Sequence, residues 1–232
     1  MIYVISDTHL RHNTPFEYQI DLCKFLMSIT DEDKLFIAGD FLDFWTSANS
    51  EVIVHNEIVF KNLPKHTYII NGNHDYILHA SGFQIYGDYG FTVSEKRFKV
   101  LHGFELDVIV NYEHLSIEGY TDIAEYLCSN GNTIGTIATL LWNYYSYAFD
   151  VLDILKDRIL RMPETLTSDI LGINMFAESA GRNLLLDLSP DAYLIFGHTH
   201  SPYIGKISAN SGKFPDYLTI DDTGKVDLHI WK

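Results

Sequence analysis

Aspartate, histidine and asparagine side chains recur in short blocks along the chain, and five of the eleven histidines lie inside these blocks. These side chains donate oxygen and nitrogen ligands to divalent cations, and histidine also transfers protons near neutral pH. In an extended segment, residues two apart point to the same side, so Asp7 with His9, and His198 with His200, can each present two ligands together. The blocks are Asp7-Thr8-His9, Gly39-Asp40-Phe41-Leu42-Asp43, Gly72-Asn73-His74-Asp75, His102-Gly103 and Gly197-His198-Thr199-His200.

The joint pattern predicts one compact site. Glycines next to the polar residues allow sharp turns and a close approach of the backbone to a ligand. The alternative is that these side chains only satisfy buried backbone groups at strand ends, which is common for a single Asp-x-His but not for a whole set.

Each block follows a short apolar run that is typical of a buried strand. In open α/β sheets, functional groups gather beyond the carboxyl ends of the strands, so residues far apart in sequence would become neighbours there. The runs are IYVIS before Asp7, KLFIAG before Asp40, TYIIN ending at Asn71, shortly before Asn73, FKVL before His102 and YLIFG before His198.

Helices and further strands complete the expected architecture. Phe16, Ile20, Cys23 and Met27 fall at helical spacing, so we expect helices to cover the sheet. Toward the C-terminus, the runs YIGKI, DYLTI and VDLHI alternate with turn residues and predict antiparallel strands, consistent with a second sheet.

Length and charge limit the classes of function. With 232 residues we expect a single domain spanning 1–232. The 16 basic and 31 acidic residues give a net charge of -15, which argues against nonspecific binding of long nucleic acids. Cys23 and Cys128 lie far apart and form no paired spacing, and the N-terminus has no secretory pattern, so we expect the reducing cytoplasm.

The interval 108–190 interrupts the alternation of strands and helices and predicts an inserted helical cap within that domain. Its segment ATLLWNYYSYAF carries no charge and falls short of a membrane span. We expect core packing there, and an interfacial surface that touches membrane or lipid is the alternative.

The blocks, in this order, resemble the calcineurin-like metallophosphoesterase family. The resemblance covers almost the whole chain and implies an α/β fold in which two facing mixed β-sheets are flanked by helices, as a four-layer sandwich. It implies two divalent metal ions, with Asp40 bridging them. The implied ligands are Asp7, His9, Asp40 and His200 for the first metal, and Asp40, Asn73, His102 and His198 for the second.

The resemblance also implies a mechanism. Two cations about 4 Å apart activate a bridging hydroxide that attacks phosphorus in line. His74, which has no ligand role in the family pattern, suits a general acid or a donor to phosphate charge, and Asp75 would orient it by a hydrogen bond. Asp43 would fix a ligand histidine or else cap a helix. Arg11 and His12 are candidates for substrate binding, although exposed loop residues are the commoner case.

The substrate is less well defined by sequence. The block Gly39-Asp40-Phe41-Leu42-Asp43-Phe44-Trp45, together with His102-Gly103 followed by Asp107, resembles the UDP-2,3-diacylglucosamine pyrophosphatase branch. We expect a phosphohydrolase that cleaves a phosphate ester or pyrophosphate bond in a small phosphorylated substrate, such as a nucleotide or nucleotide-sugar. The alternatives are a phosphodiesterase or nuclease, and a noncatalytic interaction scaffold with an unknown protein partner. The mixed ligands suit manganese or iron, with zinc or nickel as further candidates.

Overall fold

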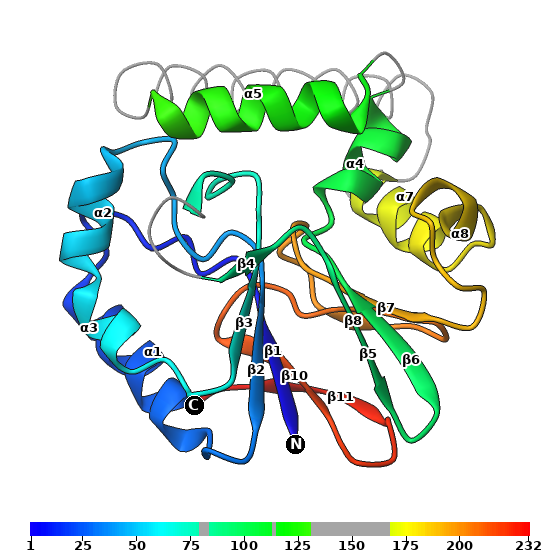
Figure 1. The fold of residues 1–232 in the computed structure, drawn as a ribbon, viewed down its shortest axis with the longest axis horizontal. Helices are drawn as coiled ribbons and strands as arrows, with labels where there is room; N and C mark the ends of the chain where they lie inside the picture. Colours follow the sequence, from blue (N-terminus) through cyan, green and yellow to red (C-terminus); the bar gives the residue numbers. More distant parts are fainter. Residues whose placement is uncertain (79–83, 113–114, 131–167) are drawn as a thin grey trace, which may run out of the picture.

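The computed structural model describes residues 1–78, 84–112, 115–130 and 168–232, and within them two mixed sheets face each other (Figure 1). The first sheet has the strand order β11-β10-β1-β2-β3-β4 and the second β5-β6-β7-β9-β8. The strands are β1 (Ile2–Ile5), β2 (Lys34–Ala38), β3 (Thr67–Ile70), β4 (Ile85–Tyr86), β5 (Tyr89–Val93), β6 (Lys96–Val100), β7 (Tyr193–Phe196), β8 (Tyr203–Ile204), β9 (Ser208–Asn210), β10 (Asp216–Ile220) and β11 (Val226–Ile230).

The strands predicted to carry the functional blocks are β1, β2, β3, β6 and β7. β1, β2 and β3 run parallel in the first sheet, and β6 and β7 run parallel in the second. Parallel strands end at the same edge, so the loops that follow them lie together. The predicted α/β fold of two mixed sheets with flanking helices is confirmed.

The C-terminal strands differ from the prediction in one respect. β10 and β11 are antiparallel, as expected, but they extend the first sheet because β10 pairs with β1. Leu218 and Ile220 are fully buried on the face that packs toward the second sheet, which is where their alternating pattern places them.

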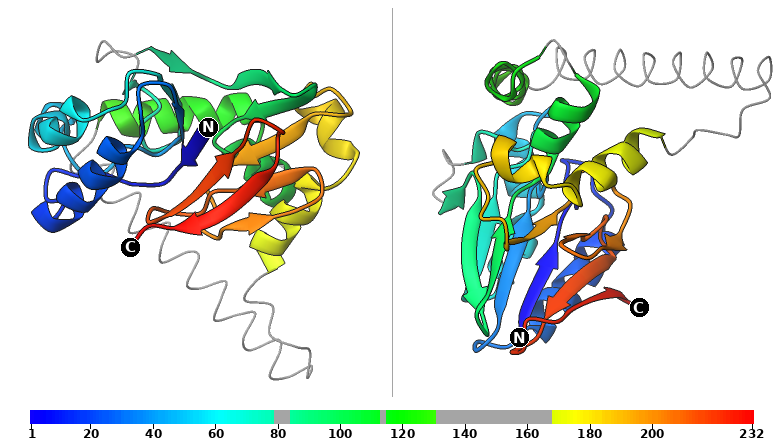
Figure 2. Two further views of the ribbon diagram at one scale, coloured as in Figure 1. Left: turned by 90° about the horizontal axis from the view of Figure 1, so that it is seen from below. Right: turned by 90° about the vertical axis from the view of Figure 1, so that its right-hand side faces the viewer.

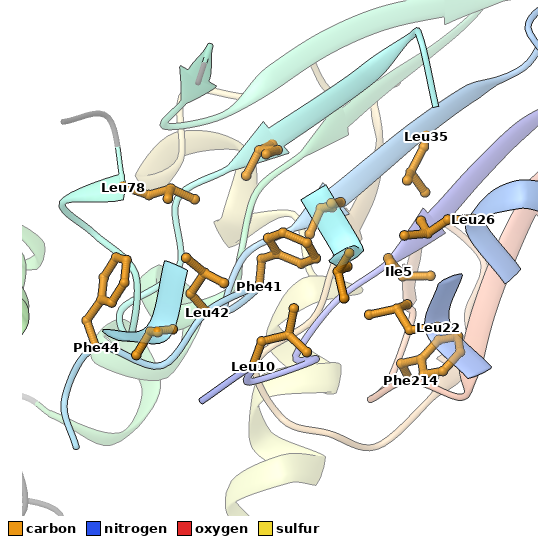
Figure 3. Packing of buried hydrophobic residues seen from close by; sticks show 14 of the residues in the cluster. Ile5, Leu10, Leu22, Leu26, Leu35, Phe41, Leu42, Phe44, Leu78 and Phe214 are labelled. Atoms are coloured by element: carbon orange, nitrogen blue, oxygen red, sulfur yellow. The ribbon is translucent and has the colours of Figure 1, made fainter. Parts of the chain in front are cut away.

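Helices cover the outer face of each sheet, as the views in Figure 2 show. On the first sheet, Leu22 and Leu26 pack with Ile5 and Leu35 in a continuous apolar core (Figure 3). On the second, Leu106 packs with residues of β7. The helices are α1 (Phe16–Ser28), α2 (Asn49–His55) and α3 (Glu57–Lys61) on the first sheet, and α4 (Phe104–Asn111), α7 (Ser168–Ala177) and α8 (Gly181–Leu185) on the second.

A further helix, α5 (Ile117–Ser129), crosses above the strand ends in Figure 1. Together with α4, α7 and α8 it gives helices to the described part of the predicted cap. Residues 113–114 and 131–167, which include the aromatic segment at 138–149, lie outside the described residues. The cap boundaries at 108 and 190 therefore stay a prediction. None of the helices in the described ranges is long and apolar enough to cross a membrane.

Candidate metal centre

The loops after β1 and β2 continue the parallel pairing of their strands. The Asp7 N–H donates to the Gly39 carbonyl at 3.1 Å, and the His9 N–H donates to the Asp40 carbonyl at 2.9 Å. The first two functional blocks are thereby held side by side. In the second sheet, the Gly197 N–H donates to the His102 carbonyl at 2.8 Å and joins the loops after β6 and β7 in the same way.

One cluster of ligand-type atoms forms around Asp7, His9 and His200. The Nε2 atoms of His9 and His200 are 3.1 Å apart, and His200 Nε2 lies 3.3 Å from Asp7 Oδ1. These three residues each offer one ligand atom within 4.8 Å of the others. They are three of the four residues predicted to hold the first metal.

A second cluster forms around Asn73, His102 and His198. His102 Nε2 lies 3.1 Å from Asn73 Oδ1 and 3.3 Å from His198 Nδ1. The other ring nitrogen of His102 is 2.8 Å from the Ala38 carbonyl oxygen, which fixes the ring. These residues are three of the four predicted for the second metal.

Asp40 lies between the two clusters. Its Oδ2 is 3.6 Å from His9 Nε2 and 3.3 Å from His102 Nε2. Its Oδ1 accepts the backbone N–H of His74 at 2.8 Å, so the carboxylate is fixed in this orientation. One oxygen of Asp40 is thus available to both clusters.

The donor atoms fit divalent cations. Asp7 is fully buried, and its Oδ2 accepts the His198 N–H at 2.9 Å, but within the described part of the chain its Oδ1 forms no hydrogen bond of good geometry, although His200 Nε2 lies 3.3 Å away. A buried carboxylate oxygen without a partner is costly unless a cation satisfies it. The set of carboxylate, imidazole and amide donors without thiolate suits manganese, iron, zinc or nickel.

Backbone strain concentrates at the same residues. A left-handed φ is uncommon for residues other than glycine and is tolerated where the surrounding structure enforces it, often at functional sites. The predicted ligands with positive φ are Asp7 (54°), His9 (45°), Asp40 (49°), His198 (66°) and His200 (56°).

Electrostatics favours the ligating forms of Asp40 and His9. Burial opposes ionisation of Asp40, but the charges of His102 and His74 outweigh it and hold the Asp40 pKa well below its usual value. Burial lowers the pKa of His9 to about 4, so this imidazole is neutral at pH 7. Burial also disfavours the charged form of His102, but Asp40 raises the His102 pKa to about 10, so coordination by His102 requires loss of that proton.

His74 lies beside the centre and is held by Asp43. His74 Nδ1 is 3.2 Å from Asp43 Oδ1, and the other carboxylate oxygen of Asp43 accepts from Nε and Nη2 of Arg11, both at 2.7 Å. Asp43 was expected to fix a ligand histidine or to cap a helix. The structure places it on His74 instead, and it brings Arg11 to the rim of the centre with its side chain 45% exposed.

The predicted hydrogen bond from Asp75 to His74 is wrong. The Asp75 carboxylate is fully buried and accepts the backbone N–H groups of Phe41 (2.8 Å), Leu42 (3.2 Å) and Gly72 (2.8 Å). Burial, followed by the charge of Asp40, raises the Asp75 pKa to about 7. Asp75 thus ties the loop after β2 to the loop after β3, and its carboxylate points away from His74.

His12, the other substrate-binding candidate, is exposed, and its Nδ1 bonds Ser47 Oγ. Nothing in this contact connects it to the centre. The hydroxyl of Ser47 is itself buried, so the bond anchors the loop that carries His12.

Two residues contact the centre although the sequence analysis gave them no role. Asp107, in the first turn of α4, lies 2.9 Å from His198 Nε2 and so turns Nδ1 of that ring toward His102. Trp45 stacks on His74 with ring centroids 4.1 Å apart. Both residues belong to the segments that resemble the pyrophosphatase branch, and that was the only signal in the sequence.

Facing mixed sheets with Asp, His and Asn side chains at the strand ends define a class of metal-dependent hydrolases that act on phosphoester bonds. The family model for calcineurin-like phosphoesterases matches residues 1–202. The chain therefore belongs to the calcineurin-like phosphoesterase family, and it is a metal-dependent hydrolase of phosphoester bonds.

Solved structures that align with nearly the whole chain share little sequence identity with it. They include an archaeal phosphodiesterase (15% identity, 99% of this chain and 98% of that chain, TM-score 0.43) and a dimetal phosphatase from Danio rerio (12%, 100% and 98%, 0.42). A third is Vps29 with zinc from Entamoeba histolytica (13%, 98% and 96%, 0.41). Similarity at this level says nothing about the substrate. No curated protein matches the chain.

Proposed function

We propose that this chain is a binuclear phosphohydrolase that cleaves a phosphate ester or pyrophosphate bond in a small nucleotide or nucleotide-sugar. The observation that carries the proposal is the position of Asp40 Oδ2, which lies within 3.6 Å of a ring nitrogen in each ligand cluster. A shared carboxylate is the arrangement that two adjacent cations need.

The seven proposed ligands form two sets that share the Asp40 carboxylate. Asp7, His9 and His200 would hold one cation, Asn73, His102 and His198 the other, and Asp40 both. We propose manganese or iron for the native pair, with zinc or nickel as further candidates, since the donors are oxygen and nitrogen only. When bound, the cations would lower the pKa of a water molecule and neutralise charge on the phosphoryl oxygens.

His74 would donate the proton to the leaving group, and Arg11 would contact the phosphate. His74 Nδ1 is taken up by Asp43, and its Nε2 has no hydrogen-bond partner in the described ranges, so this atom is free to give a proton to the leaving oxygen. Arg11 is held through Nε and Nη2, which leaves Nη1 for a phosphate oxygen.

A pyrophosphate in a nucleotide-sugar is the bond type that we favour. The segments that resemble the UDP-2,3-diacylglucosamine pyrophosphatase branch contain Trp45 and Asp107, and both contact residues of the centre. This supports the branch assignment. We also propose that the cap contacts a lipid or the substrate.

Hydrolysis assays with paired substrates test the proposal. The purified chain is supplied with manganese and offered a phosphomonoester, a phosphodiester and a UDP-sugar pyrophosphate, each with and without chelator. We expect chelator-sensitive turnover that is fastest with the pyrophosphate. Preference for the diester would favour a phosphodiesterase, and no turnover with two metals bound would favour a scaffold.

A further inference from the structure

We propose that Trp45 is a positioning residue, which holds the His74 ring in the orientation for proton donation to the leaving group. The inference rests on the role of His74 in the proposed function. It assigns a new task to a residue that carries no titratable group and is not a metal ligand.

Trp45 touches the neighbourhood of His74 at three points. Its indole stacks on the imidazole with centroids 4.1 Å apart and ring planes 20° apart. Its Nε1–H donates to the Asn73 carbonyl at 2.9 Å, and its backbone N–H donates to Asp43 Oδ1 at 3.1 Å. The indole is therefore fixed to Asn73, the residue before His74, and the backbone of Trp45 is fixed to Asp43, whose carboxylate also contacts the His74 ring.

These contacts complete the restraint of the imidazole. Asp43 fixes one edge of the ring through Nδ1, and His9 meets the ring edge to face at 4.8 Å with planes at 89°. Rotation of His74 about its side-chain bonds would have to displace the indole, which is only 8% exposed and belongs to the core cluster of the first sheet. With Trp45 in place, the Nε2 atom of His74 points in one fixed direction.

A second element, α5, shares a hydrogen-bond acceptor with the indole. Cys128 of α5 is fully buried, and its Sγ–H donates at 3.5 Å to the same Asn73 carbonyl that accepts from Trp45. Leu127 of α5 lies in the same core cluster as Trp45. The orientation of His74 is thus linked to the packing of α5 through the indole.

Trp45 serves the step in which the bond to the leaving oxygen breaks and that oxygen is protonated. The attacking water first loses one proton to the solvent, and the bond from the resulting hydroxide oxygen to phosphorus forms as the bond from phosphorus to the leaving oxygen breaks. The electron pair of the broken bond stays on the leaving oxygen, which takes the proton from His74 Nε2. A p-nitrophenolate leaves without this proton, whereas an alkoxide needs it.

The test therefore compares a p-nitrophenyl ester and an alkyl ester of UMP, which place the nucleotidyl phosphorus of the proposed substrate next to two different leaving oxygens. For Trp45→Leu we expect kcat to fall by about 10- to 100-fold with the alkyl ester, while KM and the p-nitrophenyl rate change by less than about 3-fold. Equal losses on both esters, or a loss of bound metal, would overturn the inference. Absence of turnover by the wild-type chain would instead refute the proposed function.

Three variants sharpen the comparison. In a Trp45→Leu/His74→Ala double variant, the alkyl rate should equal that of His74→Ala alone, because one step is lost in both; additive losses would contradict the inference. Trp45→Phe keeps a ring face and should recover most of the alkyl rate. Phe44→Leu, at a core residue that is 1% exposed, is the matched control and should lower both rates alike or neither.

Fluorescence gives a readout that does not depend on activity or metal. In a chelator-treated chain with Trp142→Phe and Trp231→Phe, Trp45 is the sole tryptophan. Removing the imidazole with His74→Ala should uncover the indole face and move the emission to longer wavelength. Unchanged emission would show that the two rings do not stack in solution.

Discussion

At the scale of single residues, the carboxylate of Asp40 and the ring of His74 do different work although they are neighbours. Asp40 Oδ1 accepts the His74 N–H at 2.8 Å, and Oδ2 faces both ligand clusters. The His74 side chain instead contacts Asp43 and Trp45. Loss of each residue should lower turnover for a different reason.

We therefore predict that Asp40→Asn abolishes turnover and loses metal, whereas His74→Ala keeps its metal and loses about 10²- to 10⁴-fold in rate with a substrate whose leaving group needs a proton. An amide at position 40 cannot supply a charged oxygen to two cations. Metal content after gel filtration, measured by plasma mass spectrometry, separates the two variants. Full activity in either one would contradict these assignments.

Asp107 should matter through His198. Its carboxylate holds the Nε2 side of that ring at 2.9 Å, so Asp107→Asn should weaken metal binding by about 10- to 100-fold. A competition titration against a fluorescent chelator measures the affinity directly. Asn111→Ala is the control, because Asn111 bonds Asp107 without contacting His198; an equal loss in both variants would count against the role of Asp107.

The ligand types and their order could be predicted from the sequence because each block follows a strand, and four of the seven ligands lie beside a glycine. The partners of those ligands could not. Asp75 looked suited to orient its neighbour His74, but adjacent residues after a strand point in different directions, and Asp75 turns inward to three amide groups. Asp43, distant in sequence from His74, takes that place through tertiary packing.

At the scale of elements, the centre depends on close contact between the loops after β2 and β3. Gly72 packs closely against Asp40. A Cβ added to Gly72 would lie 2.1 Å from Asp40 Oδ1 and 2.2 Å from the Asp40 backbone nitrogen. Only a residue without a side chain allows this approach. The two loops can then share Asp75 as a common acceptor.

Gly72→Ala should therefore displace Asp40, lower the metal content and reduce the free energy of unfolding by about 1–3 kcal/mol. Gly87→Ala is the matched control, because a Cβ there would meet nothing within 4 Å and should change stability by less than about 0.5 kcal/mol. Chemical denaturation and metal analysis of both variants check this. Retention of metal and stability by Gly72→Ala would refute the close packing.

Strands with continuous apolar runs were predictable at this scale, since burial on both faces leaves a plain signal. The sheet that each strand joins was not predictable from the sequence. β10 and β11 resemble any antiparallel pair in sequence, and the choice of β1 as the partner of β10 depends on which apolar surfaces meet in the folded chain.

At the scale of the whole molecule, the buried Arg182 in α8 and the half-buried Glu178 after α7 anchor this helical segment to the second sheet. Arg182 of α8 is fully buried, and its guanidinium donates to the carbonyls of Ile207 at 2.8 Å and Ala192 at 2.5 Å. Glu178, directly after α7, accepts the N–H groups of Lys206 at 3.0 Å and Ile207 at 3.2 Å. The turn before β9 is thereby held at Lys206 and Ile207, and the segment before β7 is held at Ala192.

Arg182→Met should reduce the free energy of unfolding by about 2–4 kcal/mol, because two buried carbonyls lose a charged donor. Metal content should stay unchanged, since Arg182 contacts no residue of the centre in the described ranges. Lys206→Met removes the same charge at an exposed neighbour and should cost less than about 0.5 kcal/mol. Equal effects of the two substitutions would contradict the anchoring role.

The central claim is that two cations held by one ligand set, with Asp40 shared, enable hydrolysis of a phosphoester bond. The most direct test adds manganese stepwise to the chelator-treated chain and follows the rate with the best substrate. We predict no turnover before addition and a rate that rises until two equivalents per chain have bound. Turnover that persists in chelator, or that is complete at one equivalent, would contradict the account.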